Sequence, residues 1–151
     1  MPEIIIADTS SLIGFDKINH LDLLKVMYGR VTVTEEVAEE YGEPLPEWFE
    51  VRTAGNRELM RSFLPILHVG EASAITLAVE TKDSILVIDE KDGRKVARQM
   101  GLRLTGTLGI LLKAKLLGHI PRVQPFILEL LHHGFRIDEL LVQQVLEQAG
   151  E

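Results

Sequence analysis

In Ile4-Ile5-Ile6-Ala7-Asp8, four apolar residues run directly into an acid. A second stretch, Ile85-Leu86-Val87-Ile88-Asp89, repeats this arrangement later in the chain. Short, continuous apolar runs bounded by polar residues are typical of buried strands. A carboxylate at the end of such a run is unfavourable unless another group compensates for its lost hydration. Asp8 and Asp89 are therefore the first candidates for a functional site.

Strand-like and helix-like segments alternate along the chain. The pattern predicts strands over residues 3–7, 30–33, 48–52, 85–88 and 102–104. It predicts helices over residues 10–18, 20–28, 34–42, 56–64, 70–81, 91–100, 107–117, 121–134 and 138–149. Continuous apolar strands that alternate with helices indicate a parallel sheet covered on both faces, so we expect a three-layer α/β/α fold with a central parallel sheet. Ligands bind beyond the carboxyl ends of the strands in such sheets, and both acids lie at such ends.

The composition is that of an ordinary globular domain. The chain has 151 residues, of which 46% are hydrophobic and 26% charged. We expect a single domain over residues 1–151, with a core at about 3–118 and extra C-terminal helices at about 121–149. No apolar run reaches about 18 residues, so no membrane association is expected. The start, Met1-Pro2-Glu3, leads straight into a strand without a signal peptide, which makes a cytoplasmic location the expectation.

Two glutamates join the aspartates as candidates. Glu71 shares one predicted helix face with Ala74, Ile75 and Ala78, so it is expected to point into the core. Glu40 follows Val37 by three positions, so it is expected on the same core-facing side of the predicted helix. Helix geometry favours Glu40 over Glu36 as the acid on that side. Several acids at one place are typical of a site for a hard divalent cation, which prefers oxygen ligands. Absence of cysteine excludes thiolate metal sites, and the five histidines have no ligand spacing.

Four motifs in this order resemble those of a PIN domain. They are the segment Ile5-Ile6-Ala7-Asp8-Thr9-Ser10-Ser11-Leu12-Ile13, the acidic motif Val37-Ala38-Glu39-Glu40, the motif Gly70-Glu71-Ala72-Ser73-Ala74-Ile75, and Val87-Ile88-Asp89-Glu90 followed by Gly106-Thr107-Leu108-Gly109. The closing helices are similar to those of a subgroup of VapC-like PIN proteins.

The resemblance implies a PIN-like fold and a metal-dependent ribonuclease that acts on single-stranded RNA. Many members of the family are toxins of toxin–antitoxin pairs, so a cognate antitoxin is an expected partner. Carried over by motif, the catalytic and metal-binding acids would be Asp8, Glu40, Glu71 and Asp89, with Mg²⁺ or Mn²⁺ as the cofactor. Ser10 would be a supporting polar group. Glu90 and Asp92 also follow the last motif, and either could supply a fifth acid.

Basic residues gather after the last acidic motif. Residues 91–122 carry eight basic residues and one acid, although the whole chain has a net charge of -7. Such asymmetry can mark a face that binds a polyanion. One helical stripe has the spacing i, i+3, i+4 and i+7, and it consists of Lys91, Arg94, Lys95 and Arg98. A solvated face is the ordinary reading of such a stripe, but its position beside Asp89 favours contacts with RNA phosphates.

Further observations qualify this RNA-binding hypothesis. Arg94 could support the acids instead, and Lys113 and Lys115 are the next candidates for phosphate contacts. Aromatic residues are scarce, at 5% of the chain, so no base-stacking surface is visible. We expect exposed apolar helices near residues 10–28, which would favour a homodimer.

Two alternatives remain open. The chain could be a catalytically weak PIN-like binding module in an RNA-processing complex, although such a module would have no need for four costly acids. It could also be a phosphohydrolase or receiver-like domain with Asp8 as the phosphoacceptor. Those designs place a second acid beside or two after the first, where this chain has Thr9 and Ser10.

Overall fold

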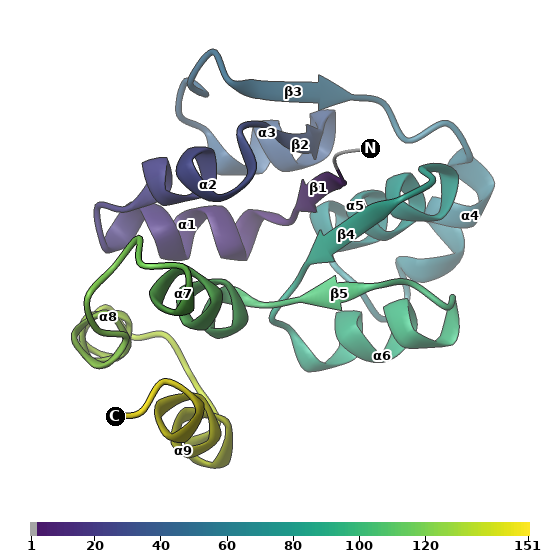
Figure 1. Ribbon diagram of the computed structural model, residues 1–151. Coiled ribbons are helices and arrows are strands. Elements are labelled where there is room, and N and C mark those ends of the chain that lie inside the picture. The colour runs from purple at the N-terminus through teal and green to yellow at the C-terminus, as the bar shows by residue number, and fades with distance from the viewer. Residues whose placement is uncertain (1–2) are drawn as a thin grey trace.

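A five-stranded parallel sheet forms the centre of the computed structural model, which describes residues 3–151 (Figure 1). The strands are β1 (Ile4–Ala7), β2 (Val31–Thr34), β3 (Phe49–Arg52), β4 (Ser84–Val87) and β5 (Leu104–Thr105). Their order in the sheet is β3-β2-β1-β4-β5, and every neighbouring pair is parallel. The predicted parallel sheet is confirmed. Met1 and Pro2 lie outside the described residues, so the expected run from Met1 into the strand can be followed only from Glu3.

Helices connect and cover the strands. Within residues 3–151 they are α1 (Thr9–Lys17), α2 (Leu21–Tyr28), α3 (Glu35–Tyr41), α4 (Arg57–Phe63), α5 (Val69–Glu80), α6 (Lys91–Gln99), α7 (Thr107–Leu116), α8 (Gln124–His132) and α9 (Glu139–Gln148). Each corresponds to a predicted helix, with ends that differ by up to three residues. None of these helices is long and apolar enough to cross a membrane.

The alternation of side chains along β1 divides the core into two layers. Ile5 and Ala7 point toward a cluster formed with α1, α2 and α7, whereas Ile6 points toward a cluster formed with α4, α5 and α6. The result is the predicted three-layer α/β/α arrangement. Figure 1 shows α8 and α9 beyond α7, on the side away from the sheet. Their buried residues, including Ile127 and Val145, belong to the same apolar cluster as α1 and α7.

The apolar residues of α1 and α2 are used inside the chain. Leu12, Phe15, Ile18 and Leu24 are each at most 1% exposed, and Val26 is the large apolar residue of α2 that remains on the surface. The expectation of exposed apolar helices near residues 10–28 is therefore wrong, because these helices pack on the sheet. The sequence-based expectation of a homodimer through α1 and α2 therefore no longer holds.

The sheet topology brings the two aspartates to one place. The chain leaves β1 toward β2 on one side of the sheet, and β4 adds to the other side of β1. The crevice between β1 and β4 is thus the topological switch point, where α/β sheets bind ligands. Ala7 of β1 is paired with Val87 of β4, so Asp8 and Asp89 both leave the sheet at this crevice.

Candidate active site

Asp8 is fully buried at the start of α1. Its Oδ1 accepts a hydrogen bond from the Ser11 backbone N–H at 3.0 Å, which makes Asp8 the N-cap of the helix. Its Oδ2 is buried without a hydrogen-bond partner. Burial raises the pKa of Asp8 to about 7, against the Ser11 hydrogen bonds, and the charges of Asp89 and Glu71 raise it further. Helix capping does not account for the burial of the whole carboxylate, because the cap uses Oδ1 alone and leaves Oδ2 without a partner.

Glu71 is the second buried acid, at 8% exposure on the first turn of α5. Its Oε1 accepts the His68 backbone N–H at 3.4 Å, and its Oε2 is buried without a partner. Burial raises the pKa of Glu71, the His68 hydrogen bond lowers it, and the charge of Glu90 raises it. The close approach of α6 depends on Gly93, since a Cβ there would lie 2.9 Å from Glu71 Oε2 and 2.5 Å from Ile88 Cδ1.

Glu40 reaches the same place from an exposed position. The sequence predicts a core-facing residue, and this is wrong: Glu40 is exposed near the end of α3. Its carboxylate nevertheless reaches the first turns of α1 and α5, where Oε1 accepts the Thr9 hydroxyl at 2.6 Å and Oε2 accepts the Gly70 backbone N–H at 3.2 Å. A Cβ at Gly70 would lie 2.0 Å from Glu40 Oε1, so only glycine permits this contact.

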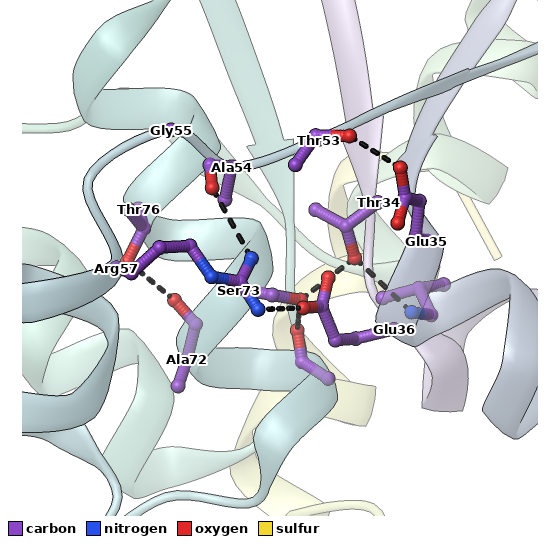
Figure 2. Close-up of polar contacts among 12 residues, drawn as sticks. Thr34, Glu35, Glu36, Thr53, Ala54, Gly55, Arg57, Ala72, Ser73 and Thr76 are labelled. Atoms are coloured by element: carbon purple, nitrogen blue, oxygen red, sulfur yellow. Dashed lines mark hydrogen bonds and ion pairs between the residues drawn. The ribbon is translucent and has the colours of Figure 1, made fainter.

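Glu36 points to a different region. Its Oε2 accepts a hydrogen bond from Arg57 Nη2 at 2.8 Å, as Figure 2 shows, and its side chain is 15% exposed. Beside it, the Thr34 and Ser73 hydroxyls share a 2.7 Å hydrogen bond between β2 and α5. Glu36 therefore pairs α3 with α4, whereas Glu40 faces Thr9 and Gly70.

Asp89 has every oxygen engaged. Its Oδ1 accepts the Thr107 backbone N–H at 2.8 Å, and its Oδ2 accepts the Thr107 hydroxyl at 2.6 Å and the Ser11 hydroxyl at 3.3 Å. Ser11 consequently joins the two aspartates, with its N–H on Asp8 and its hydroxyl on Asp89. A Cβ at Gly106 would lie 2.5 Å from Asp89 Oδ1, so this acid also rests against a glycine.

These residues line two adjoining cavities. The first has a volume of about 260 Å³ and is lined by Asp8, Thr9, Ser10, Glu40, His68, Glu71 and Glu90. Asp89 lines the second, larger cavity of about 630 Å³. Ser10 and Glu90 line both, so the cavities meet at the switch point. The structure thus places three of the four predicted acids on one wall, and the fourth next to it.

A family model described as a PIN domain matches residues 4–151. The chain belongs to the PIN-domain family. PIN domains are generally nucleases, which are hydrolases. No curated protein and no solved structure matches the chain.

The donor set of this PIN domain fits a hard cation. Within residues 3–151, no three His, Asp or Glu side chains lie close enough together to hold a metal ion. Asp8 and Glu71, however, both line the first cavity, and each has one buried carboxylate oxygen without a hydrogen-bond partner. Mg²⁺ commonly takes one or two carboxylates from a protein and keeps several waters. Two free carboxylate oxygens meet that requirement, and Glu40 and Glu90 line the same cavity.

The supporting residues expected from the sequence fall into different places. Ser10 and Glu90 line the first cavity, and Asp92 does not, although its charge contributes to the raised pKa of Glu71. Glu90 is therefore the better placed of the two for a fifth acid, which stays a prediction. Sequence reasoning missed the hydroxyl donors Thr9, Ser11 and Thr107. Their adjacency to the acidic motifs was the available signal.

The four residues of the basic stripe on α6 differ in how far they are buried. Lys91, Lys95 and Arg98 are exposed on α6. Arg94 is half-buried, and its Nη1 donates to the Ile88 backbone carbonyl at 2.7 Å. Burial lowers the pKa of Arg94, the charge of Arg98 lowers it as well, and Asp89 raises it. Arg94 thus braces the end of β4 beside Asp89, which favours the supporting role over a phosphate contact.

Proposed function

We propose that this PIN domain is a Mg²⁺- or Mn²⁺-dependent endoribonuclease that acts on single-stranded RNA. The observation that carries the proposal is the pair of unpartnered buried oxygens on Asp8 and Glu71 at the switch point. Buried charges are unfavourable without a counter-charge, and the described ion pairs give neither acid a Lys or Arg partner. A divalent cation would supply the missing charge.

The acids would hold the cation, and the hydroxyls would hold the acids. In this proposal Asp8 and Glu71 bind the cation directly, and Glu40 and Asp89 lie beside them. These four residues are called the acidic wall. A cation at this position would acidify a bound water and offset charge on the scissile phosphate. Thr9 fixes the carboxylate of Glu40 through its hydroxyl. Such second contacts orient ligands and are commonly worth about 10-fold or more in metal affinity or activity.

The hydroxyls of Ser11 and Thr107 have the same effect on Asp89. Because a hydroxyl donates a hydrogen bond without adding positive charge, the acidic wall keeps its negative potential. A lysine at either position would orient the carboxylate and neutralise it. The choice of donors therefore suits a site that binds a cation.

We also propose a biological role, for which the family resemblance is the support. The protein would be the toxin of a toxin–antitoxin pair, active in the cytoplasm, with an antitoxin protein as its partner. A homodimer remains part of the proposal, but not through the buried faces of α1 and α2. Expression of the chain alone should arrest growth of a host cell, and Asp8→Asn should relieve the arrest. Normal growth with the intact chain well expressed would contradict the toxin role.

The central experiment is RNA cleavage with matched variants. The wild-type protein should cut a labelled single-stranded RNA in Mg²⁺ or Mn²⁺ and not in EDTA. Asp8→Asn and Asp89→Asn should lose this activity, whereas Asp22→Asn, at an exposed site on α2, should keep it. Thermal unfolding supplies a second measurement: a cation at a hundredfold excess over its Kd should stabilise the wild type by about 2.7 kcal/mol. Full activity of both site variants would refute the metal-nuclease proposal.

The second candidate function is a PIN-like RNA-binding module without catalysis. The observation in its favour is that no three acidic or histidine side chains in the described part of the chain come within reach of one ion. This candidate predicts RNA binding that is indifferent to Mg²⁺ and Mn²⁺, and no cleavage under any of the conditions above. The same two assays therefore separate the two functions.

A further inference from the structure

The larger of the two cavities has walls unlike those of the acidic one. It has a volume of about 630 Å³, within the range of roughly 300–1,000 Å³ that small-molecule sites occupy. The cavity is lined by the starts of α6 and α7 and by residues 134–138, which join α8 to α9. Segments that are distant in the sequence thus enclose a space that adjoins Asp89.

We propose that this cavity is the subsite for a nucleotide of the RNA that flanks the scissile phosphate, with Phe135 under the base and Arg136 at a phosphate. The proposal rests on the nuclease function above. It concerns which residues hold the RNA, and it adds a role for the C-terminal helices.

The aromatic wall is the first argument. Phe135 lines the cavity and is partly buried. Its ring packs against α1, where a Cβ on Gly14 would lie 3.6 Å from Phe135 Cε1. Ile137 and Leu141 continue the apolar wall. A ring that packs on α1 and also lines the cavity can serve as a stacking platform for a base, and stacking does not depend on which base is present.

The charges of the cavity are the second argument. Lys91 and Arg136 line it from opposite elements, and both are exposed. Neither takes part in any of the ion pairs of residues 3–151, so both cations are available to a phosphate. Three acids also line the cavity. Asp138 accepts the Leu140 N–H as the N-cap of α9, and Asp89 and Glu90 lie where the cavity adjoins the acidic one.

Continuity with the acidic cavity is the third argument. Ser10 and Glu90 line both spaces, and Asp89 closes the larger cavity on the side of the switch point. A strand of RNA with one phosphate at the acids would therefore place the next nucleotide beside Phe135. The ring that lines the acidic cavity is the imidazole of His68, and no Phe, Tyr or Trp lines it, so the larger apolar ring is on the side of Phe135.

The test measures RNA binding by fluorescence anisotropy in EDTA. The probe is a fluorescein-labelled oligoadenylate of about ten nucleotides, a length within the usual range of single-strand sites. Phe135→Leu keeps an apolar side chain against α1 and removes the ring, and it should weaken binding by about 10-fold. Arg136→Gln should make the salt dependence of log affinity shallower by roughly 0.7, the value for one lost contact with a single strand. The matched controls are Phe126→Leu and Arg61→Gln. Phe126 is partly buried and Arg61 exposed, neither lines either cavity, and both variants should bind as the wild type does.

The outcomes separate the subsite from the nuclease function. Loss of binding in the two cavity variants but not in the controls supports the subsite, whether or not RNA is cut. Cleavage by the wild type, with equal RNA affinity in all four variants, overturns the subsite and leaves the nuclease function standing. Absence of RNA binding by the wild type overturns the subsite, and absence of cleavage in Mg²⁺ or Mn²⁺ as well overturns the nuclease function too. Because Phe135→Leu could also loosen the packing on α1, its melting temperature is compared with that of Phe126→Leu. If Phe135→Leu does not fold, the exposed Arg136→Gln variant decides, and an unchanged salt dependence there overturns the subsite.

Discussion

Replacement of Asp8 by asparagine should stabilise the cation-free protein, by an amount that depends on pH. The folded protein raises the pKa of Asp8 from 3.8 to about 7, chiefly through burial. A raised pKa means that the folded state holds the proton more tightly than the unfolded state does. The stabilising contribution is complete below pH 3.8 and is lost as the pH rises through about 7. One pKa unit corresponds to about 1.36 kcal/mol, so a shift of about three units amounts to about 4 kcal/mol.

Asparagine does not ionise, so Asp8→Asn escapes this loss. Relative to the wild type, its free energy of unfolding should rise by about 1.4 kcal/mol per pH unit between about pH 4 and 7, and then level off. The measurement is urea unfolding followed by circular dichroism, in EDTA, at several pH values across this range and just above it. Asp22→Asn, at an exposed site, controls for the loss of one carboxylate. A difference between Asp8→Asn and wild type that stays constant across this range would refute the reasoning.

The remaining predictions address the neighbours of Asp8. Glu40→Gln should reduce Mn²⁺ affinity measured by calorimetry by about 10-fold or more. Glu36→Gln, which removes the ion pair with Arg57, should leave that affinity unchanged. The double change Lys95→Gln and Arg98→Gln should make the slope of log RNA affinity against log salt shallower by roughly 1.4, because two phosphate contacts are lost. An unchanged slope would mean that Lys95 and Arg98 lie on a solvated face that does not contact RNA. Thr107→Val, which removes one of the hydroxyl donors to Asp89, should lower the cleavage rate by about 10-fold or more, while Thr107→Ser should restore it.

Most of the fold was predictable because each local signal agreed with the tertiary structure. The apolar runs before Asp8 and Asp89 became neighbouring strands, and Thr34 caps α3 through its hydroxyl, which accepts the Val37 N–H at 3.1 Å. The burial of α1 and α2 was not predictable in the same way. An apolar helix can face a partner or its own core, and only the packing on the sheet decides between the two.

The site was predictable as a set of acids and not as a geometry. Helix periodicity placed Glu71 in the core correctly, because it lies in the first turn of a buried helix. The same rule failed for Glu40, since a long side chain at a helix end can extend to a neighbouring helix whatever face its Cα occupies. The contact of Ser11 with Asp89 and that of Phe135 with α1 join segments far apart in the chain, and no local pattern contains them.

Three of the four acids of this site, Glu40, Glu71 and Asp89, each rest against a glycine. A Cβ added at Gly70, Gly93 or Gly106 would approach a carboxylate oxygen of a different acid to 2.0, 2.9 and 2.5 Å, respectively. None of these glycines has the left-handed φ that marks Gly42 or Gly101 at helix ends. An alanine scan is ordinarily understood as the removal of side chains. At these three positions an alanine substitution would instead add a methyl group between the glycine backbone and the neighbouring carboxylate. The positions of these carboxylates could therefore be changed without mutating an acidic residue.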